Sequence, residues 1–124
     1  MEKYCVSLEL ARQLKELGFP QETEFYWIKA GGVYDLEYGK KDSIFGLTIE
    51  DCIATPHIGE LGTWFPAYYV SYMGLGRQMW YCKFIEHDTM KGDPWACDDS
   101  EANARAKMLI YLATHSLLNP KTLM

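Results

Sequence analysis

The chain has 124 residues, of which 48% are hydrophobic and 23% charged, with a formal net charge of −5 at pH 7. This balance predicts one globular domain over residues 1–124. The negative charge disfavours general nucleic-acid binding, because phosphate-binding proteins gather Lys and Arg on one face. No stretch approaches the ~20 apolar residues that span a bilayer, and no signal peptide is seen, so we expect a cytoplasmic protein without membrane contact.

The first half of the chain predicts one helix followed by strands. Leucines at helical spacing predict a helix over residues 7–17 with Ser7 as its N-cap. Gly18-Phe19-Pro20 predicts the end of that helix in a left-handed turn. Aromatic and β-branched runs at 25–29 and 33–38, around two glycines, predict a β-hairpin. Residues 44–49 predict a further short strand.

The second half predicts a short helix, a hairpin and a long helix. Thr55 is the expected N-cap of the short helix, with Pro56 in its first position. Residues 68–73 and 79–86 predict the hairpin, and a polar loop connects it to a helix over 100–117. The inner face of this last helix is expected to carry Ala102, Ala106, Leu109, Ile110, Ala113 and Leu117.

This order of elements predicts an α+β fold, in which a mainly antiparallel β-sheet is covered by two long helices and one short helix. The four cysteines form no CxxC pair, so we expect reduced thiols and no zinc site. A Cys52 nucleophile with His57 as its base would need only spatial proximity, but a buried thiol near a helix start accounts for both residues. No phosphate-loop, dinucleotide or catalytic motif is seen, so we expect no cofactor and a binding protein rather than an enzyme.

Aromatic residues make up 15% of the chain, which is more than a core of this size easily hides. An exposed subset would form a stacking surface for planar ligands or a protein interface. Arginine and histidine side chains would add contacts to an anion. The candidate ligand-binding residues are Trp64, Tyr69, Trp80 and Tyr81 for stacking, with His57, Arg77 and Arg105 for charge. Core packing, a solvated turn at Arg77 and a Glu101–Arg105 ion pair are the structural alternatives.

Four segments of the chain resemble small uncharacterised proteins encoded by tailed phages and prophages. They are residues 5–11, 18–20, 52–66 and 99–112. The resemblance implies a sheet sandwiched by helices, and it brings no catalytic residues with it. Most of the matching positions are caps, glycines and helix-face residues.

The resemblance and the aromatic surplus together suggest a phage accessory protein with an anti-defence role. On this hypothesis the protein sequesters a small nucleotide-like immune signal of the host without catalysis. One alternative is an inhibitor that binds a host defence protein directly, and another is a structural or accessory phage protein. An apolar patch left on a small aromatic-rich domain also favours a homo-oligomer.

Overall fold

The computed structural model describes residues 4–38, 51–65, 69–73, 79–84 and 95–123. The helices are α1 (Leu8–Glu16), α2 (Ile58–Thr63), α3 (Glu101–Thr114) and the 3-10 turn η3 (Pro120–Leu123). One antiparallel sheet, in the order β2-β1-β3, contains β1 (Phe25–Ala30), β2 (Val33–Tyr38) and β3 (Asp51–Ala54). A second antiparallel sheet, in the order β4-β5-β6, contains β4 (Tyr69–Met73), β5 (Trp80–Phe84) and β6 (Trp95–Asp98).

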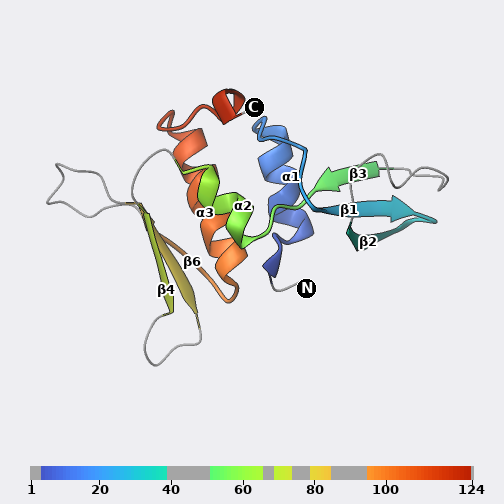
Figure 1. Cartoon of the computed structure of the whole chain (residues 1–124), viewed down its shortest axis with the longest axis horizontal. Coiled ribbons are helices and arrows are strands. Elements are labelled where there is room, and N and C mark those ends of the chain that lie inside the picture. The colour runs from blue at the N-terminus through green and yellow to red at the C-terminus, as the bar shows by residue number, and fades with distance from the viewer. Residues whose placement is uncertain (1–3, 39–50, 66–68, 74–78, 85–94, 124) are drawn as a thin grey trace, which may run out of the picture.

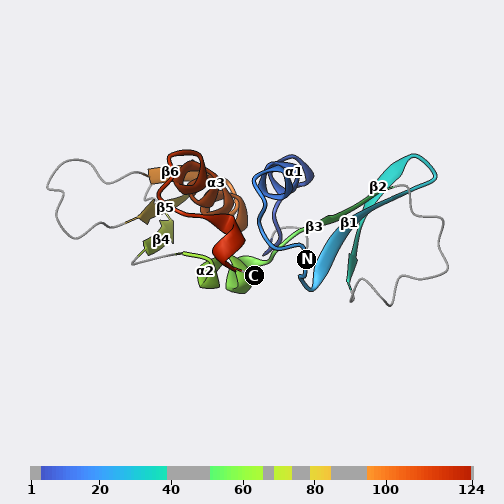
Figure 2. The ribbon, with the colours of Figure 1, turned by 90° about the horizontal axis from the view of Figure 1, so that it is seen from above.

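The helices lie between the two sheets. In two perpendicular views α1 is next to the β2-β1-β3 sheet and α3 is next to the β4-β5-β6 sheet (Figure 1, Figure 2). The predicted α+β class with antiparallel strands and three helices is confirmed. The described strands are divided between two sheets, however, so the helices form a middle layer. Each three-stranded sheet thus has a helix against one of its faces.

The end of α1 follows the prediction from Gly18-Phe19-Pro20. Gly18 adopts the left-handed conformation, with φ 92°. The Gly18 N–H donates to the Lys15 carbonyl at 3.1 Å, and the Phe19 N–H donates to the Leu14 carbonyl at 3.0 Å. This pair of bonds is the Schellman arrangement, which satisfies two of the last helical carbonyls. Phe19 is thereby turned back into the core.

The first hairpin is also confirmed. Ala30 pairs with Val33, and the intervening Gly31 and Gly32 have φ values of 63° and 82°. Two successive positive φ angles suit a two-residue turn that matches the twist of the strands. Two strands, β3 and β6, were not predicted as such, because four-residue runs carry too little periodicity. The strand expected at residues 44–49 lies outside the described residues.

The prediction that Thr55 caps the short helix is wrong, because α2 begins after His57. Thr55 and Pro56 instead pair with the N-terminal segment: the Thr55 hydroxyl donates to the Val6 carbonyl at 2.6 Å, and the Val6 N–H donates to the Pro56 carbonyl at 3.2 Å. These contacts hold residues 55–56 outside the helix. The cap falls to His57, two residues further on.

Helix α3 is buried on a wider surface than its predicted face. Of the predicted residues, Ala102, Ala106 and Leu109 are fully buried, whereas Leu117 lies beyond the helix and is 45% exposed. Further buried positions are Ala104, Met108 and Leu112. The helix contacts α1, α2, β5 and β6, so apolar residues are needed on several of its sides. A sequence pattern with one apolar face therefore underestimates how much of α3 is buried.

Two sheet edges are covered in the same way by lysines from the helices. The Lys15 ammonium of α1 donates to the Cys52 carbonyl of β3 at 3.2 Å and lies 3.8 Å from the Asp51 carboxylate. The Lys107 ammonium of α3 donates to the Cys97 carbonyl of β6 at 3.0 Å and lies 2.9 Å from Asp98. Lysines at strand edges discourage pairing with other chains. They also fix each helix relative to its sheet.

Replacing Leu109 by Ala should lower the free energy of unfolding by about 2–5 kcal/mol, because it opens a cavity at a fully buried position. The matched control is Leu117→Ala, since Leu117 is 45% exposed and should change stability by less than about 0.5 kcal/mol. Urea titration followed by circular dichroism measures both. Equal losses in the two variants would contradict the central position of α3.

Candidate functional site

The starts of α1 and α3 lie side by side. The two helices run in the same direction, so both N-terminal ends are at the same end of the molecule (Figure 1). Asn103 joins them: its side-chain oxygen accepts the Ser7 N–H at 2.8 Å, and its own N–H donates to the Ser100 hydroxyl at 3.0 Å. The Ser100 side chain therefore caps α3, whereas the Ser7 side chain, at the predicted N-cap of α1, makes no capping bond.

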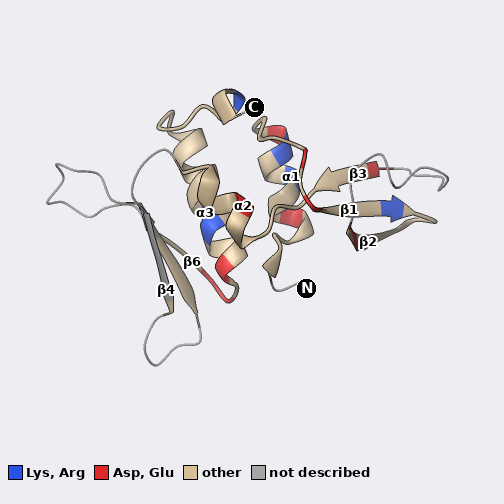
Figure 3. Ribbon diagram, viewed as in Figure 1, with Lys and Arg blue, Asp and Glu red and all other residues tan. Residues whose placement is uncertain are grey.

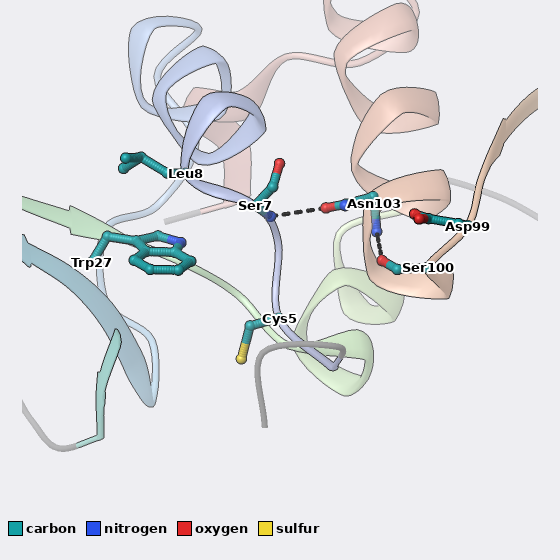
Figure 4. A pocket seen from close by; sticks show the side chains of 7 residues that line it. All are labelled: Cys5, Ser7, Leu8, Trp27, Asp99, Ser100 and Asn103. Atoms are coloured by element: carbon teal, nitrogen blue, oxygen red, sulfur yellow. Dashed lines mark hydrogen bonds between the residues drawn. The ribbon is translucent and has the colours of Figure 1, made fainter. Parts of the chain in front are cut away.

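A cavity of about 440 Å³ opens at this junction. Its lining comes from the N-terminal segment, β1 and the start of α3, and consists of Cys5, Ser7, Leu8, Trp27, Asp99, Ser100 and Asn103 (Figure 4). The Trp27 indole N–H donates to the Val6 carbonyl at 3.0 Å, which fixes the orientation of the ring. Figure 4 shows Ser7, Ser100 and Asn103 across the cavity from Trp27. The site thus combines an indole with hydroxyl, amide and carboxyl groups.

Acidic residues surround this end of the molecule. Glu9, Glu60 and Glu101 each occupy the first turn of a helix (Figure 3). Such positions are favourable because the N-terminal end of a helix carries partial positive charge.

The cavity itself contains the carboxyl group of Asp99. A hydrogen bond with Asp98, together with the charge of Asp98, raises the pKa of Asp99. Burial alone would raise the pKa of Asp98, but hydrogen bonds from Asp99, Lys107 and the Ser100 N–H lower it. The pKa values of the two neighbouring carboxyls are therefore moved apart, with Asp98 the stronger acid.

The buried cysteines are poor nucleophiles. Burial, with a smaller contribution from Glu60, raises the pKa of Cys5 to about 11. Burial also raises the pKa of Cys82 to about 12. Both groups are protonated at neutral pH, and the thiolate is the reactive form. The thiol in the cavity is accordingly a lining group and not an activated nucleophile.

The His57 ring is committed to the start of α2. Its Nδ1 accepts the N–H groups of Gly59 at 3.0 Å and Glu60 at 3.3 Å. A neutral ring then carries its proton on Nε2, which lies 3.4 Å from a Glu24 oxygen and 3.5 Å from a Glu60 oxygen. A Cβ atom at position 59 would lie 3.1 Å from the ring, so the glycine makes room for the imidazole. None of these four ring contacts involves Cys52.

Two of the other residues expected at the site have structural contacts. Trp64 is 8% exposed and its ring centroid lies 5.4 Å from that of Phe19, within the core. The Arg105 guanidinium donates to the Glu101 carboxylate at 2.8 Å and to the Ile58 carbonyl at 2.9 Å. The latter bond connects α3 to the start of α2. The ion pair is mostly buried.

The remaining predicted residues are on the second hairpin. Trp80 and Tyr81 are consecutive in β5, so they face opposite sides of the sheet, and both are half-buried. Tyr69 pairs with Phe84 through the backbone, and its side chain is not described. Arg77 lies outside the described residues. The role of all seven candidates in ligand binding stays a prediction.

The sequence did not single out the residues that line the larger cavity. Trp27 was assigned only to a strand, Ser7 only to a helix cap and Ser100 only to the start of a helix. Asn103 carries no signal by itself, because its bond to Ser7 joins residues 96 positions apart. A cap that opens into a cavity cannot be distinguished in sequence from an ordinary cap.

No helix in the described part of the chain is long and apolar enough to cross a membrane. Among the same residues, no three His, Cys, Asp or Glu side chains gather as metal ligands would.

Comparison of the chain with family models, curated proteins and solved structures found no match. The resemblance to phage proteins therefore stays a prediction.

Brief treatment of the folded protein with iodoacetamide at neutral pH should modify Cys52 and Cys97 before Cys5 and Cys82, because the first pair is partly exposed and the second is buried. Peptide mass mapping identifies the modified residues, and labelling in denaturant, where all four react, is the control. Early modification of Cys5 would show that the cavity thiol is reactive after all.

Replacing Arg105 by Gln should lower the free energy of unfolding by about 1–3 kcal/mol, because the Glu101 carboxylate and Ile58 carbonyl lose a charged donor. Lys107→Gln is the control on the same helix. Its side chain is 42% exposed, so we expect a loss of at most about 1 kcal/mol. Thermal unfolding compares the two variants, and a smaller effect at Arg105 would contradict its structural role.

Proposed function

We propose that this protein binds a small, planar, nitrogen-rich ligand of the nucleobase or nucleoside type and does not change it chemically. The ligand lies in the cavity between the starts of α1 and α3. Its ring contacts the indole of Trp27, and its polar edge faces Ser7, Asn103 and Asp99.

The observation that carries this proposal is the combination of an indole and several polar groups in one cavity of about 440 Å³. Ligand sites of roughly 300–1,000 Å³ commonly combine apolar walls with a few placed polar groups. Stacking of a base on an aromatic ring contributes ~1–3 kcal/mol. The Ser7 hydroxyl makes no capping bond, so it can donate to a ligand without weakening α1.

The charge of the lining favours the base of a nucleotide over its phosphates. Asp99 is the charged residue in the larger cavity, and Arg105 is already bonded to Glu101 and Ile58. In a phage-infected cell, the protein then acts in the host cytoplasm and removes a nucleotide-like immune signal by holding its base. The sequence resemblance supports the part of the proposal that concerns a phage. The chemistry of the lining residues supports binding of the ligand without catalysis.

Direct binding to a host defence protein is the second candidate. An exposed aromatic side chain on β2 favours it, since Tyr38 is 72% exposed. Aromatic residues of this kind are frequent at protein interfaces. The same surface would serve in a homo-oligomer.

The test begins with pure protein incubated in extract from phage-infected, defence-activated host cells. After washing and denaturation, mass spectrometry should detect a small nitrogen-rich aromatic compound released from the wild-type protein. Titration calorimetry with adenosine and guanosine then measures the affinity for defined ligands.

The variant Ser7→Leu fills the cavity and should abolish retention, because its side chain lines the site and makes no capping bond. Thr114→Leu, an exposed change at the far end of α3, should retain the compound. Equal retention by both variants places the ligand elsewhere. Release of no compound from wild-type protein, together with capture of a host protein, defeats the proposal in favour of direct inhibition.

A further inference from the structure

A second cavity, of about 250 Å³, adjoins the first. Both cavities are lined by Asp99 and Ser100, the two residues that precede α3. On the other side, the consecutive residues Tyr4 and Cys5 line the smaller and the larger cavity respectively. The two cavities therefore adjoin each other between the N-terminal segment and the start of α3, and together they are called the groove below.

We propose that this groove takes one ligand with two planar rings joined by a positively charged linker. One ring contacts Trp27, the other contacts Trp80, and the linker crosses Asp99. This inference rests on the proposed function, because its first ring takes the place of the base against Trp27, and it extends that ligand to a two-ringed organic cation.

Each of the two cavities is lined by one indole. Trp27, from β1, lines the larger cavity, and Trp80, from β5, lines the smaller one. Both rings are half-buried and pack against the core, so little side-chain freedom is lost when a ligand binds. Aromatic surfaces attract planar rings and also cations, through the negative charge on the ring face.

The charged side chains that line the groove are acidic. Glu101 is neutralised by Arg105 at 2.8 Å, and Asp98, behind the lining, by Lys107 at 2.9 Å. Asp99 is exposed at the strip common to both cavities. A positively charged linker is attracted to this carboxylate, whereas a phosphate group is repelled by it.

The partial positive charges at the N-terminal ends of α1 and α3 oppose the binding of a cation, but they do not outweigh the negative charge of the carboxylates. Each N-terminal end contributes roughly +0.5 of an elementary charge. The Ser100 hydroxyl already accepts an N–H from the first turn of α3, which reduces the contribution of that end. Two acidic residues stand at the same two ends, Asp99 just before α3 and Glu9 in the first turn of α1. The balance near the groove is therefore negative.

Calorimetry on the full chain at low salt tests the inference with three probes. These are benzamidine, a bis-benzamidine series of increasing linker length, and neutral bis-benzamides of the same lengths. The best bis-benzamidine should bind about tenfold or more tightly than benzamidine, since a second stacked ring adds contact. It should also exceed its neutral analogue, and this advantage should shrink as salt is added.

Two variants assign the effects to the groove. Tyr4→Ala changes only the smaller cavity. It should therefore remove the affinity gained from the second ring and leave benzamidine binding unchanged. The control is Tyr111→Ala, at an exposed tyrosine outside both cavities. Asp99→Asn should weaken the dication several-fold without affecting the neutral probe. Asp35→Asn, at an exposed position of β2, is the control for charge.

The outcomes separate the inference from the proposed function. If nucleosides bind but the second ring adds nothing, or Tyr4→Ala weakens all probes equally, the two-cavity groove is wrong while the larger cavity stands. If the neutral analogue binds as well as the dication, the cationic ligand class is wrong. If neither nucleosides nor any of the probes bind, both proposals fail.

Discussion

The burial of α3 is the constraint on which the other parts of the structure depend. Ala102, Ala104 and Ala106 are fully buried, and such small side chains allow neighbouring elements to approach the helix closely. Larger residues further along, including Met108 and Leu112, fill the space between α3 and its neighbours. Helices α1 and α2 and the second sheet thus share one central helix. Without it, neither half of the chain would have a complete core.

Polar contacts then fix how the elements around α3 are oriented. Arg105 binds the carbonyl of Ile58 and so positions the start of α2. Asn103 accepts the Ser7 N–H and so places the start of α1 beside that of α3. Buried polar groups must find partners, and these few bonds satisfy them across long sequence separations. The helices therefore begin at one end of the molecule, where the cavities lie.

The candidate site is built from residues that first serve the fold. Ser100 caps α3, Trp27 donates to the N-terminal segment and Asn103 joins two helix starts. These three side chains are rigid because each is held by a structural bond. The acidic character of the lining has the same origin, since carboxylates at helix starts are favourable for the helices themselves. At these positions, the role of a residue in the fold and its contribution to ligand binding are consequently hard to separate.

The sequence by itself determined the local features: the Schellman end of α1 at Gly18, the two-glycine hairpin turn, the start of α3 and the α+β class. These depend on residues a few positions apart, whose conformational preferences act within one turn. Tertiary structure decided the division of the strands into two sheets, the shift of the α2 cap from Thr55 to His57 and the cavity around Trp27. Each of these depends on contacts between distant segments, such as Thr55 with Val6, for which local spacing contains no signal.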